Sequence, residues 1–454
     1  MPISINPATG DIIEEYAEHT DSDIERALGN ADLAYRDWRR SSLRDRSDLL
    51  MRIADGLEAR KEDLGRIATL EMGKRIKEAV AEVEKCAMAC RYYAEHGPQM
   101  IADDHRAGGP ASENFVAYLP IGPILAVMPW NFPYWQCLRF VAPAVMAGNV
   151  ALLKHASNVS RCALEIERVM LDAGAPQGVF QTLLISSSKV EGILKDRRIR
   201  AATLTGSEGA GAAVAATCGR EIKTTVLELG GSDPFIVMPS ADLPKAIDLG
   251  ITARMQNNGQ SCIAGKRFIV HADVYERYLE AYAERVEAMT LGDPMDAQTD
   301  LGPLSTQQGV ADLKDQIDRS VKAGARLVAG GEAPEGPGFF YKASILADVP
   351  ENAPAYREEL FGPCAIMFKV TSIDEAIDLA NDSDFGLGGA VFTNDRAEQD
   401  RFIRELDTGG THINRMTASH PALPFGGVKL SGYGRELSHE GIRAFMNAKT
   451  VTRD

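Results

Sequence analysis

The sequence predicts an α/β protein built on doubly wound, mainly parallel sheets. Two stretches of the chain, beginning near residues 149 and 241, alternate short apolar runs with segments of helical periodicity. This alternation is typical of βαβ units, whose parallel strands are covered by helices on both faces. The chain has 454 residues, and a single hydrophobic core stops growing well below that length, so we expect two or three domains.

The N-terminal part is predicted to be helical before the first sheet begins. From about residue 20 to 96, charged and apolar residues alternate at helical spacing, as in "DIERALGNADLAYRDW". The strands predicted for the first sheet are "NVALLKHAS", "GVFQTLLI", "AATLTGS" and "TTVLELGGSDPFIVM". The helices between them are predicted over about 158–173, near "SSKVEGILKD" and at "GAGAAVAATCG".

The second alternation predicts a second α/β domain. Its strands are "KRFIVH", "RLVAGG", "PCAIMFKV", "AVFT" and "THIN", and its helices are "YERYLEAYAERVEAM", about 307–325, and "IDEAIDLAND". The tail from residue 426 to 454 is rich in glycine and then extended in pattern, and it fits neither sheet. We interpret it as an assembly arm.

Composition and charge exclude several classes of partner. The formal net charge of -15 disfavours binding to nucleic acid or to anionic membranes, so a small molecule is the expected partner. The sequence has no signal peptide and no apolar run long enough to span a membrane, which predicts a cytoplasmic protein. Its seven cysteines contain no CxxC pair and favour neither a disulfide framework nor a metal site.

Polar residues at predicted strand ends are the first candidates for a site, because ligands of open α/β sheets bind there. In "TLTGSEGAG", Gly206 and Ser207 open a helix whose free N–H groups suit a phosphate, although the glycine spacing is not GxGxxG. Lys154 ends another predicted strand, close to where the ribose of a dinucleotide would lie. The alternative interpretation is an ordinary solvated lysine on the surface. Glu228 ends an apolar strand, and burial would raise its pKa as a general base requires.

Two further segments carry candidate catalytic groups. Asn131, in "MPWNFP", lies among aromatic residues, where its amide could stabilise an oxyanion or make a structural hydrogen bond. Cys262, in "NNGQSCIAGKRF", is either a nucleophile or a packed core thiol, and the cysteine alone does not decide between them.

Taken together, the motifs resemble the aldehyde dehydrogenase superfamily over nearly the whole chain. The resemblance rests on "MPWNFP", "VLELGGSDP", "NNGQSC" and "EELFGP", which follow one another in the family's order. It implies that Cys262 attacks the aldehyde, that Asn131 holds the oxyanion, and that Glu228 activates the water that hydrolyses the thioester. It also implies a Rossmann-like dinucleotide-binding domain, a catalytic domain and a small β oligomerisation arm.

The resemblance assigns the other site residues and the domains. Residues implied to hold the cofactor are Pro129, Trp130, Lys154, Ser157, Gly206, Ser207, Leu229, Glu359 and Phe361. Residues implied to contact the substrate are Phe132, Trp135, Arg139, Ser261 and Ser419, and no metal is expected. The dinucleotide-binding domain is expected over 1–229, interrupted near 113–129 by part of the arm, the catalytic domain over 230–425, and the C-terminal arm over 426–454.

Within the superfamily the chain is similar to the shorter bacterial and cyanobacterial succinate-semialdehyde dehydrogenases, through "CRYYAEHG", "LLKHASN" and "PFGGVKLSGYGREL". Arg139 matches an arginine that grips the distal carboxylate in relatives, and Ser419 falls near a second anchoring position, but Gln256 stands where many of these enzymes carry another arginine. Other small or medium-chain aldehydes therefore remain alternatives, as does a coenzyme A-acylating dehydrogenase, although Glu228 argues against the latter. A homodimer or homotetramer is expected.

Ser157 points to the cofactor. Relatives that prefer NAD often carry glutamate at this position, which would repel a 2′-phosphate, whereas a serine hydroxyl can donate to that phosphate. We therefore predict a preference for NADP, with NAD used less efficiently. The alternative is that Ser157 only caps the following helix.

Overall fold

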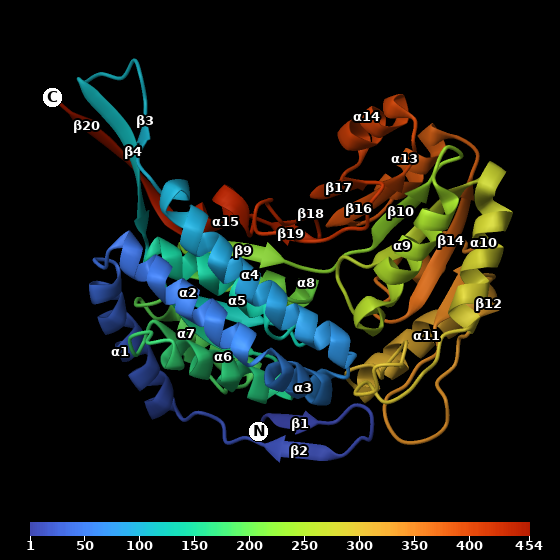
Figure 1. Ribbon diagram of the computed structural model, residues 1–454, viewed down its shortest axis with the longest axis horizontal. Helices are drawn as coiled ribbons and strands as arrows, with labels where there is room; N and C mark the ends of the chain where they lie inside the picture. The colour runs from blue at the N-terminus through green and yellow to red at the C-terminus, as the bar shows by residue number, and fades with distance from the viewer.

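The computed structural model describes residues 1–454, and its two large sheets lie in two lobes (Figure 1). The first lobe contains a six-stranded sheet of order β19-β9-β8-β5-β6-β7, in which only β19 is antiparallel to its neighbour. These strands are β5 (Pro123–Met128), β6 (Val150–His155), β7 (Phe180–Thr182), β8 (Ala201–Thr205), β9 (Thr224–Glu228) and β19 (Gly432–Tyr433).

Helices cover this sheet as the sequence predicts. The N-terminal helices α1 and α2 begin at capping boxes, in which Thr20 pairs with Asp23 and Ser42 with Asp45. The helices of this lobe are α1 (Asp21–Trp38), α2 (Leu43–Ala59), α3 (Lys61–Met72), α4 (Ile76–Met100), α5 (Trp135–Ala147), α6 (Ser160–Asp172), α7 (Val190–Lys195), α8 (Glu208–Arg220) and α15 (Ser438–Arg443), with the 3₁₀ turns η1 (Ser157–Val159) and η2 (Ser187–Lys189).

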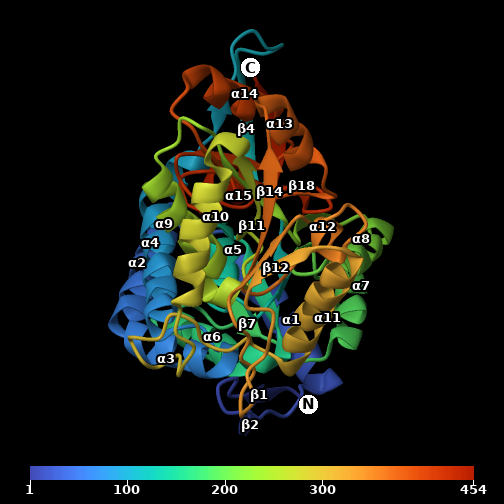
Figure 2. The same ribbon diagram turned by 90° about the vertical axis from the view of Figure 1, so that its right-hand side faces the viewer.

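The second lobe contains a seven-stranded sheet of order β12-β13-β14-β11-β10-β16-β17, parallel except for β12 (Figure 2). Its strands are β10 (Asp233–Val237), β11 (Gly265–His271), β12 (Arg326–Ala329), β13 (Ser344–Ala347), β14 (Cys364–Val370), β16 (Gly388–Phe392) and β17 (Gly410–Ile413). Its helices are α9 (Leu243–Met255), η3 (Gln256–Gly259), α10 (Ala272–Glu287), α11 (Gln307–Ala323), α12 (Pro354–Arg357), α13 (Ile373–Asn381) and α14 (Arg396–Glu405).

A separate three-stranded antiparallel sheet extends from the first lobe, at the upper left of Figure 1. Its long strands β4 (Glu113–Pro120) and β20 (Met446–Arg453) pair along their whole length, and β3 (Asp104–His105) pairs with β4. The remaining short strands are β1 (Ile3–Ile5), β2 (Ile12–Glu15), β15 (Phe385–Gly386) and β18 (Val428–Lys429).

The predicted limits of the arm are wrong at two places, and one run predicted as a single strand forms two strands on either side of the predicted 229/230 boundary. Residues 123–128 form β5, which pairs with β6 and β8 in the first lobe, so the internal part of the arm ends before them. Only the end of the tail, from residue 446, belongs to the arm, because β19 joins the first sheet and β18 pairs with β15. The run "TTVLELGGSDPFIVM" is split between the sheets, since its two glycines separate β9 from β10. No helix combines the length and apolarity needed to cross a membrane.

Candidate active site

The loop before Cys262 has an unusual backbone that determines where the thiol lies. Asn257 and Asn258 both have φ of 55°, and Gly259 has φ of 74°. A side chain at Gly259 would strike the backbone of Gly362, because its Cβ would lie 2.4 Å from that carbonyl carbon. The left-handed turn therefore packs directly on the "FGP" segment that follows Glu359.

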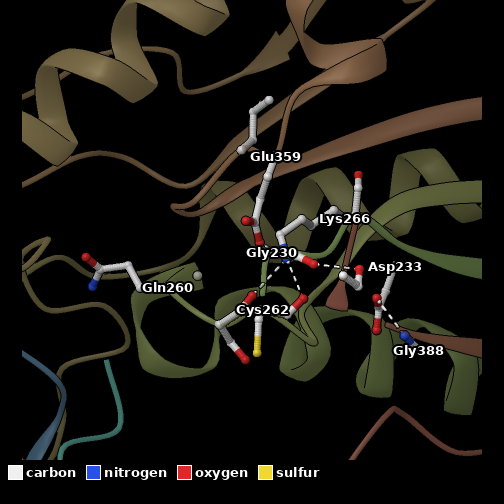
Figure 3. Close-up of polar contacts among 12 residues, drawn as sticks. Gly230, Asp233, Gln260, Cys262, Lys266, Glu359 and Gly388 are labelled. Atoms are coloured by element: carbon white, nitrogen blue, oxygen red, sulfur yellow. Dashed lines mark hydrogen bonds and ion pairs between the residues drawn. The ribbon is translucent and has the colours of Figure 1, made fainter. Parts of the chain in front are cut away.

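Lys266 holds the Cys262 loop in place (Figure 3). Its ammonium group, fully buried, donates to the carbonyl oxygens of Ser261 at 2.8 Å and Cys262 at 2.9 Å. The same nitrogen lies 2.9 Å from the Glu359 carboxylate, so a single cation joins the cysteine loop to the segment that the sequence assigns to the cofactor. A buried lysine with these partners is a structural anchor that the sequence analysis did not find.

Cys262 is the one cysteine of seven that is not buried, so it is the thiol that a ligand can reach. Desolvation raises its pKa to about 12, although Arg139 and Lys266 act in the opposite direction. The sulfur is therefore a protonated thiol near neutral pH in this structure, and it needs a base or a bound partner before it can attack as the thiolate.

Asn131 lies beside the cysteine loop. Its side-chain amide nitrogen donates to the backbone carbonyl of Gln260 at 3.2 Å. Its backbone carbonyl accepts from the side-chain amide of Asn257 at 2.8 Å. An amide nitrogen carries two hydrogens, so one remains for an oxyanion. Asn131 is buried, and its side-chain oxygen has no hydrogen-bond partner.

Glu228 ends β9, is 2% exposed and makes no hydrogen bond with either carboxylate oxygen. Desolvation raises its pKa well above the usual range, and the nearby Glu436 carboxylate raises it further, while Arg139 lowers it. A Cβ at Gly426 would lie only 2.7 Å from the Glu228 Oε1, so glycine is required there. The geometry agrees with the expectation of a buried carboxyl that holds its proton.

Arg139 contacts more than the sequence suggested. Its guanidinium forms an ion pair with Glu436, with side chains 2% and 4% exposed, and it also lies over the ring of Phe425 at 4.7 Å. Thr205 accepts a further hydrogen bond from it at 3.3 Å. Its charge is therefore already balanced by a buried carboxylate.

Two cavities, each of about 230 Å³, meet at Cys262. The first is lined by all five predicted substrate residues: Phe132, Trp135, Arg139, Ser261 and Ser419. The second is lined by Asn131 and seven of the predicted cofactor residues: Pro129, Trp130, Gly206, Ser207, Leu229, Glu359 and Phe361. Glu228 lines neither cavity, and Gln136, which the sequence analysis missed, lines both.

The second cavity has features that suit a dinucleotide. Ser207 caps α8, whose first-turn N–H groups are those that bind a phosphate in such folds. Glu359 is fixed by Lys266, and a Cβ at Gly230 would lie 2.7 Å from its Oε2, so the strand end approaches that carboxylate closely. Trp130 and Phe361 meet edge to face at 5.8 Å on the same cavity wall.

Lys154 and Ser157 lie outside both cavities, at and just beyond the end of β6. Ser157 is exposed and begins η1, but neither η1 nor α6 has a side-chain cap. The alternative that its hydroxyl only caps the helix is thus contradicted, which leaves the hydroxyl free for another partner.

Unpaired polar atoms gather around the thiol. The side-chain oxygens of Asn131, Gln136, Ser261 and Glu228 are all buried without a hydrogen-bond partner. Buried polar atoms are almost always satisfied, so such a group around a reachable thiol indicates a place for water or a polar ligand. The arrangement can support acyl transfer through the sulfur, with the Asn131 amide donor on the wall of the second cavity and the buried Glu228 carboxyl outside both cavities.

Comparison with known proteins gives consistent matches over the full length. The sequence pattern described as the aldehyde dehydrogenase family matches residues 3–451. A succinate-semialdehyde dehydrogenase [NADP(+)] of Mycobacterium avium (strain 104) is 52% identical, covering 99% of this chain and 96% of that protein. One from Mycobacterium tuberculosis (strain ATCC 25618 / H37Rv) is 51% identical, covering 99% of both chains. The crystal structure of succinic semialdehyde dehydrogenase from Streptococcus pyogenes in complex with NADP⁺ has a TM-score of 0.97 and 38% identity, covering 100% of both chains.

Proposed function

Because the chain belongs to the aldehyde dehydrogenase family, we propose that it oxidises succinate semialdehyde to succinate with NADP as the electron acceptor. The observation that carries the proposal is the position of Cys262 at the junction of the two cavities. A thiol that faces a substrate cavity on one side and a dinucleotide cavity on the other can add to the aldehyde, and loss of hydride from that adduct to a bound dinucleotide would leave the thioester. The names of the relatives support the substrate and the cofactor.

In the proposed first step, the Cys262 thiol releases its proton to solvent water, and the resulting thiolate Sγ adds to the aldehyde carbon. The Asn131 amide nitrogen and the backbone N–H of Cys262 donate to the oxyanion of the thiohemiacetal, which carries the charge that develops during the attack. Bound NADP supplies the acceptor for the hydride that leaves this carbon. Lys266 keeps the cysteine loop in position throughout, because it holds the carbonyls of both Ser261 and Cys262.

In the proposed second step, water hydrolyses the Cys262 thioester, and Glu228 accepts the proton of that water. Because burial and the Glu436 carboxylate raise its pKa, Glu228 must release its own proton to solvent before it can accept that of the attacking water. Since Glu228 lies behind the cavity wall, we expect its side chain to turn toward the sulfur for this step. The acid product is then released and the thiol regenerated.

We also propose roles for the remaining residues. Ser207 and the first turn of α8 would hold the pyrophosphate, Glu359 the nicotinamide ribose, and Lys154 with Ser157 the adenosine ribose and its 2′-phosphate. The arm strands β4 and β20 would pair with a second copy of the chain in a homo-oligomer. Small-angle scattering would distinguish a dimer from a tetramer.

The test is a panel of aldehydes assayed with both cofactors. We expect kcat/KM to be highest for succinate semialdehyde with NADP, the product to be the free acid, and Cys262→Ala to abolish turnover while NADP still binds. A parent enzyme that prefers uncharged aldehydes would refute the substrate. Acyl-coenzyme A formed in preference to the free acid would refute hydrolysis by Glu228.

A further inference from the structure

Four charged residues line the substrate cavity, and three of them already have partners of opposite charge. Glu78 lies 2.7 Å from Arg75, Glu82 pairs with Lys74, and Arg139 pairs with Glu436. The fourth, Lys85 on α4, has no carboxylate within ion-pair distance, although it is half-buried. A largely desolvated ammonium group without a counter-ion is costly, so an anionic group bound in the cavity beside Lys85 would be stabilised there.

The nearest carboxylate on the same helix is unable to serve as that counter-ion. Glu82 accepts the backbone N–H groups of Tyr134 at 2.8 Å and Trp135 at 2.9 Å with one oxygen, and its other oxygen pairs with the fully buried Lys74. One oxygen thus holds the start of α5, and the other is engaged by Lys74. The cavity itself is the remaining direction from which Lys85 can be neutralised.

Ser419 completes a set of donors beside Lys85. Its Oγ accepts from Lys85 Nζ at 2.9 Å and from the Trp135 indole N–H at 3.1 Å. A hydroxyl has two acceptor lone pairs and one hydrogen, so its hydrogen is still free to donate. Lys85 Nζ also lies 4.2 Å from the centre of the Trp135 ring, which fixes the ammonium group over the cavity wall and leaves further N–H groups unused.

We propose that Lys85 Nζ and Ser419 Oγ form the site that binds the distal carboxylate of the substrate. The inference rests on the proposed function, because it names the group that would make a carboxylated aldehyde preferable to an uncharged one. Arg139, which the sequence analysis assigned to this role, has its charge balanced by Glu436 and serves chiefly to hold that carboxylate. Ser419 was already among the predicted substrate residues, whereas Lys85 was not.

Protonation of Lys85 gives the site a pH dependence with a defined sign. Desolvation and the Arg139 charge on α5 lower its pKa to about 8, while Cys86 and Glu82 on its own helix act in the opposite direction. Two further side chains contact the ammonium group, Trp135 from α5 and Ser419 from its loop. Both are uncharged. The ammonium form is lost as pH rises through about 8, so KM for a carboxylated aldehyde rises between pH 7 and 9.

The experiment compares Lys85→Met, Lys85→Arg and the parent on succinate semialdehyde and on butanal, which has the same number of carbons and no charge. Lys77→Met, an exposed lysine on the same helix, is the matched control. We expect Lys85→Met to raise KM for succinate semialdehyde by about tenfold or more, with kcat retained and butanal changed less than about twofold. Lys85→Arg should restore most of the affinity, Lys77→Met should match the parent, and the rise of KM with pH should disappear in Lys85→Met.

The outcomes separate this inference from the proposed function. If the parent fails to prefer succinate semialdehyde over butanal, the proposed function is wrong. If the parent has that preference and Lys85→Met keeps it, the function stands and the carboxylate site lies elsewhere. An equal loss on both aldehydes would assign Lys85 a structural role and would also overturn the inference.

Discussion

Replacing Arg139 by methionine would leave the Glu436 carboxylate buried without a cation beside it. The two side chains are 2% and 4% exposed, and the remaining polar contact of the Glu436 carboxylate is a weak one from the Thr203 hydroxyl at 3.5 Å. Removing one partner of such a buried pair costs about 3–5 kcal/mol. We expect Arg139→Met to lose that much of the free energy of unfolding at pH 8.

The double variant Arg139→Met/Glu436→Gln shows whether the loss comes from the charge. Glutamine keeps the shape of the side chain but removes its charge, so we expect at least half of the loss to be recovered. Matched urea unfolding curves at a common slope give the free-energy differences from their midpoints.

The sign of the pH dependence provides a second check. Burial raises the pKa of Glu436 in the folded state, and loss of Arg139 removes the main influence that lowers it. An unfolded glutamate titrates near about 4.3, so between that pH and the raised value the folded variant binds the extra proton. Its stability therefore falls as pH rises through this window, and the loss in Arg139→Met is smaller at pH 5 than at pH 8. A loss under about 1 kcal/mol, or a double variant no more stable than the single one, would refute the assignment of a buried charge pair.

Four further predictions concern the site. In cofactor-free enzyme, alkylation of Cys262 by iodoacetamide should quicken about tenfold per pH unit from pH 7 to 10, since its pKa is raised to about 12, and a plateau below pH 9 would contradict that environment. Glu228→Gln should keep a rapid burst of NADPH while steady turnover falls by about 10²–10⁴, and loss of the burst would mean that Glu228 also activates the thiol. Ser157→Glu should lower the ratio of kcat/KM for NADP to that for NAD by about tenfold or more, and a parent that prefers NAD would refute the role of Ser157. Gly259→Ala should cost about 2–5 kcal/mol through its positive φ and its contact with Gly362, so unfolding curves that match the parent would rule out a strained turn.

The sequence predicted the parts of the fold that depend on local pattern. The alternation of apolar runs and helices located most strands of both sheets, because each buried strand or amphipathic helix is specified by its own residues. The placement of β19 in the first sheet was not predicted, since two residues that pair with a strand about 200 positions earlier carry no periodicity of their own. The run "TTVLELGGSDPFIVM" was assigned to the first sheet by its pattern alone, whereas the boundary between 229 and 230 that the resemblance implied falls between β9 and β10.

The same distinction applies to the site. The motif residues were predictable because their types and spacing are unusual, and Cys262 lies at the junction of the cavities. Lys85, Lys266 and Glu436 were missed because their importance comes from what they contact. Lys266 did leave a signal: a lysine within the apolar strand "GKRFIV" must be neutralised if that strand is buried. Lys85 left none, since a lysine on a charged amphipathic helix resembles any solvent-facing residue.

The return of the chain's last residues to the first lobe affects how the protein is made. Besides β19, the Asn149 amide donates to the carbonyl of Phe445 at 2.9 Å, and the Arg443 guanidinium donates to that of Met100 at 2.8 Å. A ribosome that synthesises the chain from its N-terminus delivers these partners last, so the first lobe is complete only when the second has already emerged. Until then the outer edge of β9 and the surface of α5 remain uncovered. The nascent enzyme therefore depends on the speed with which its final residues find that edge.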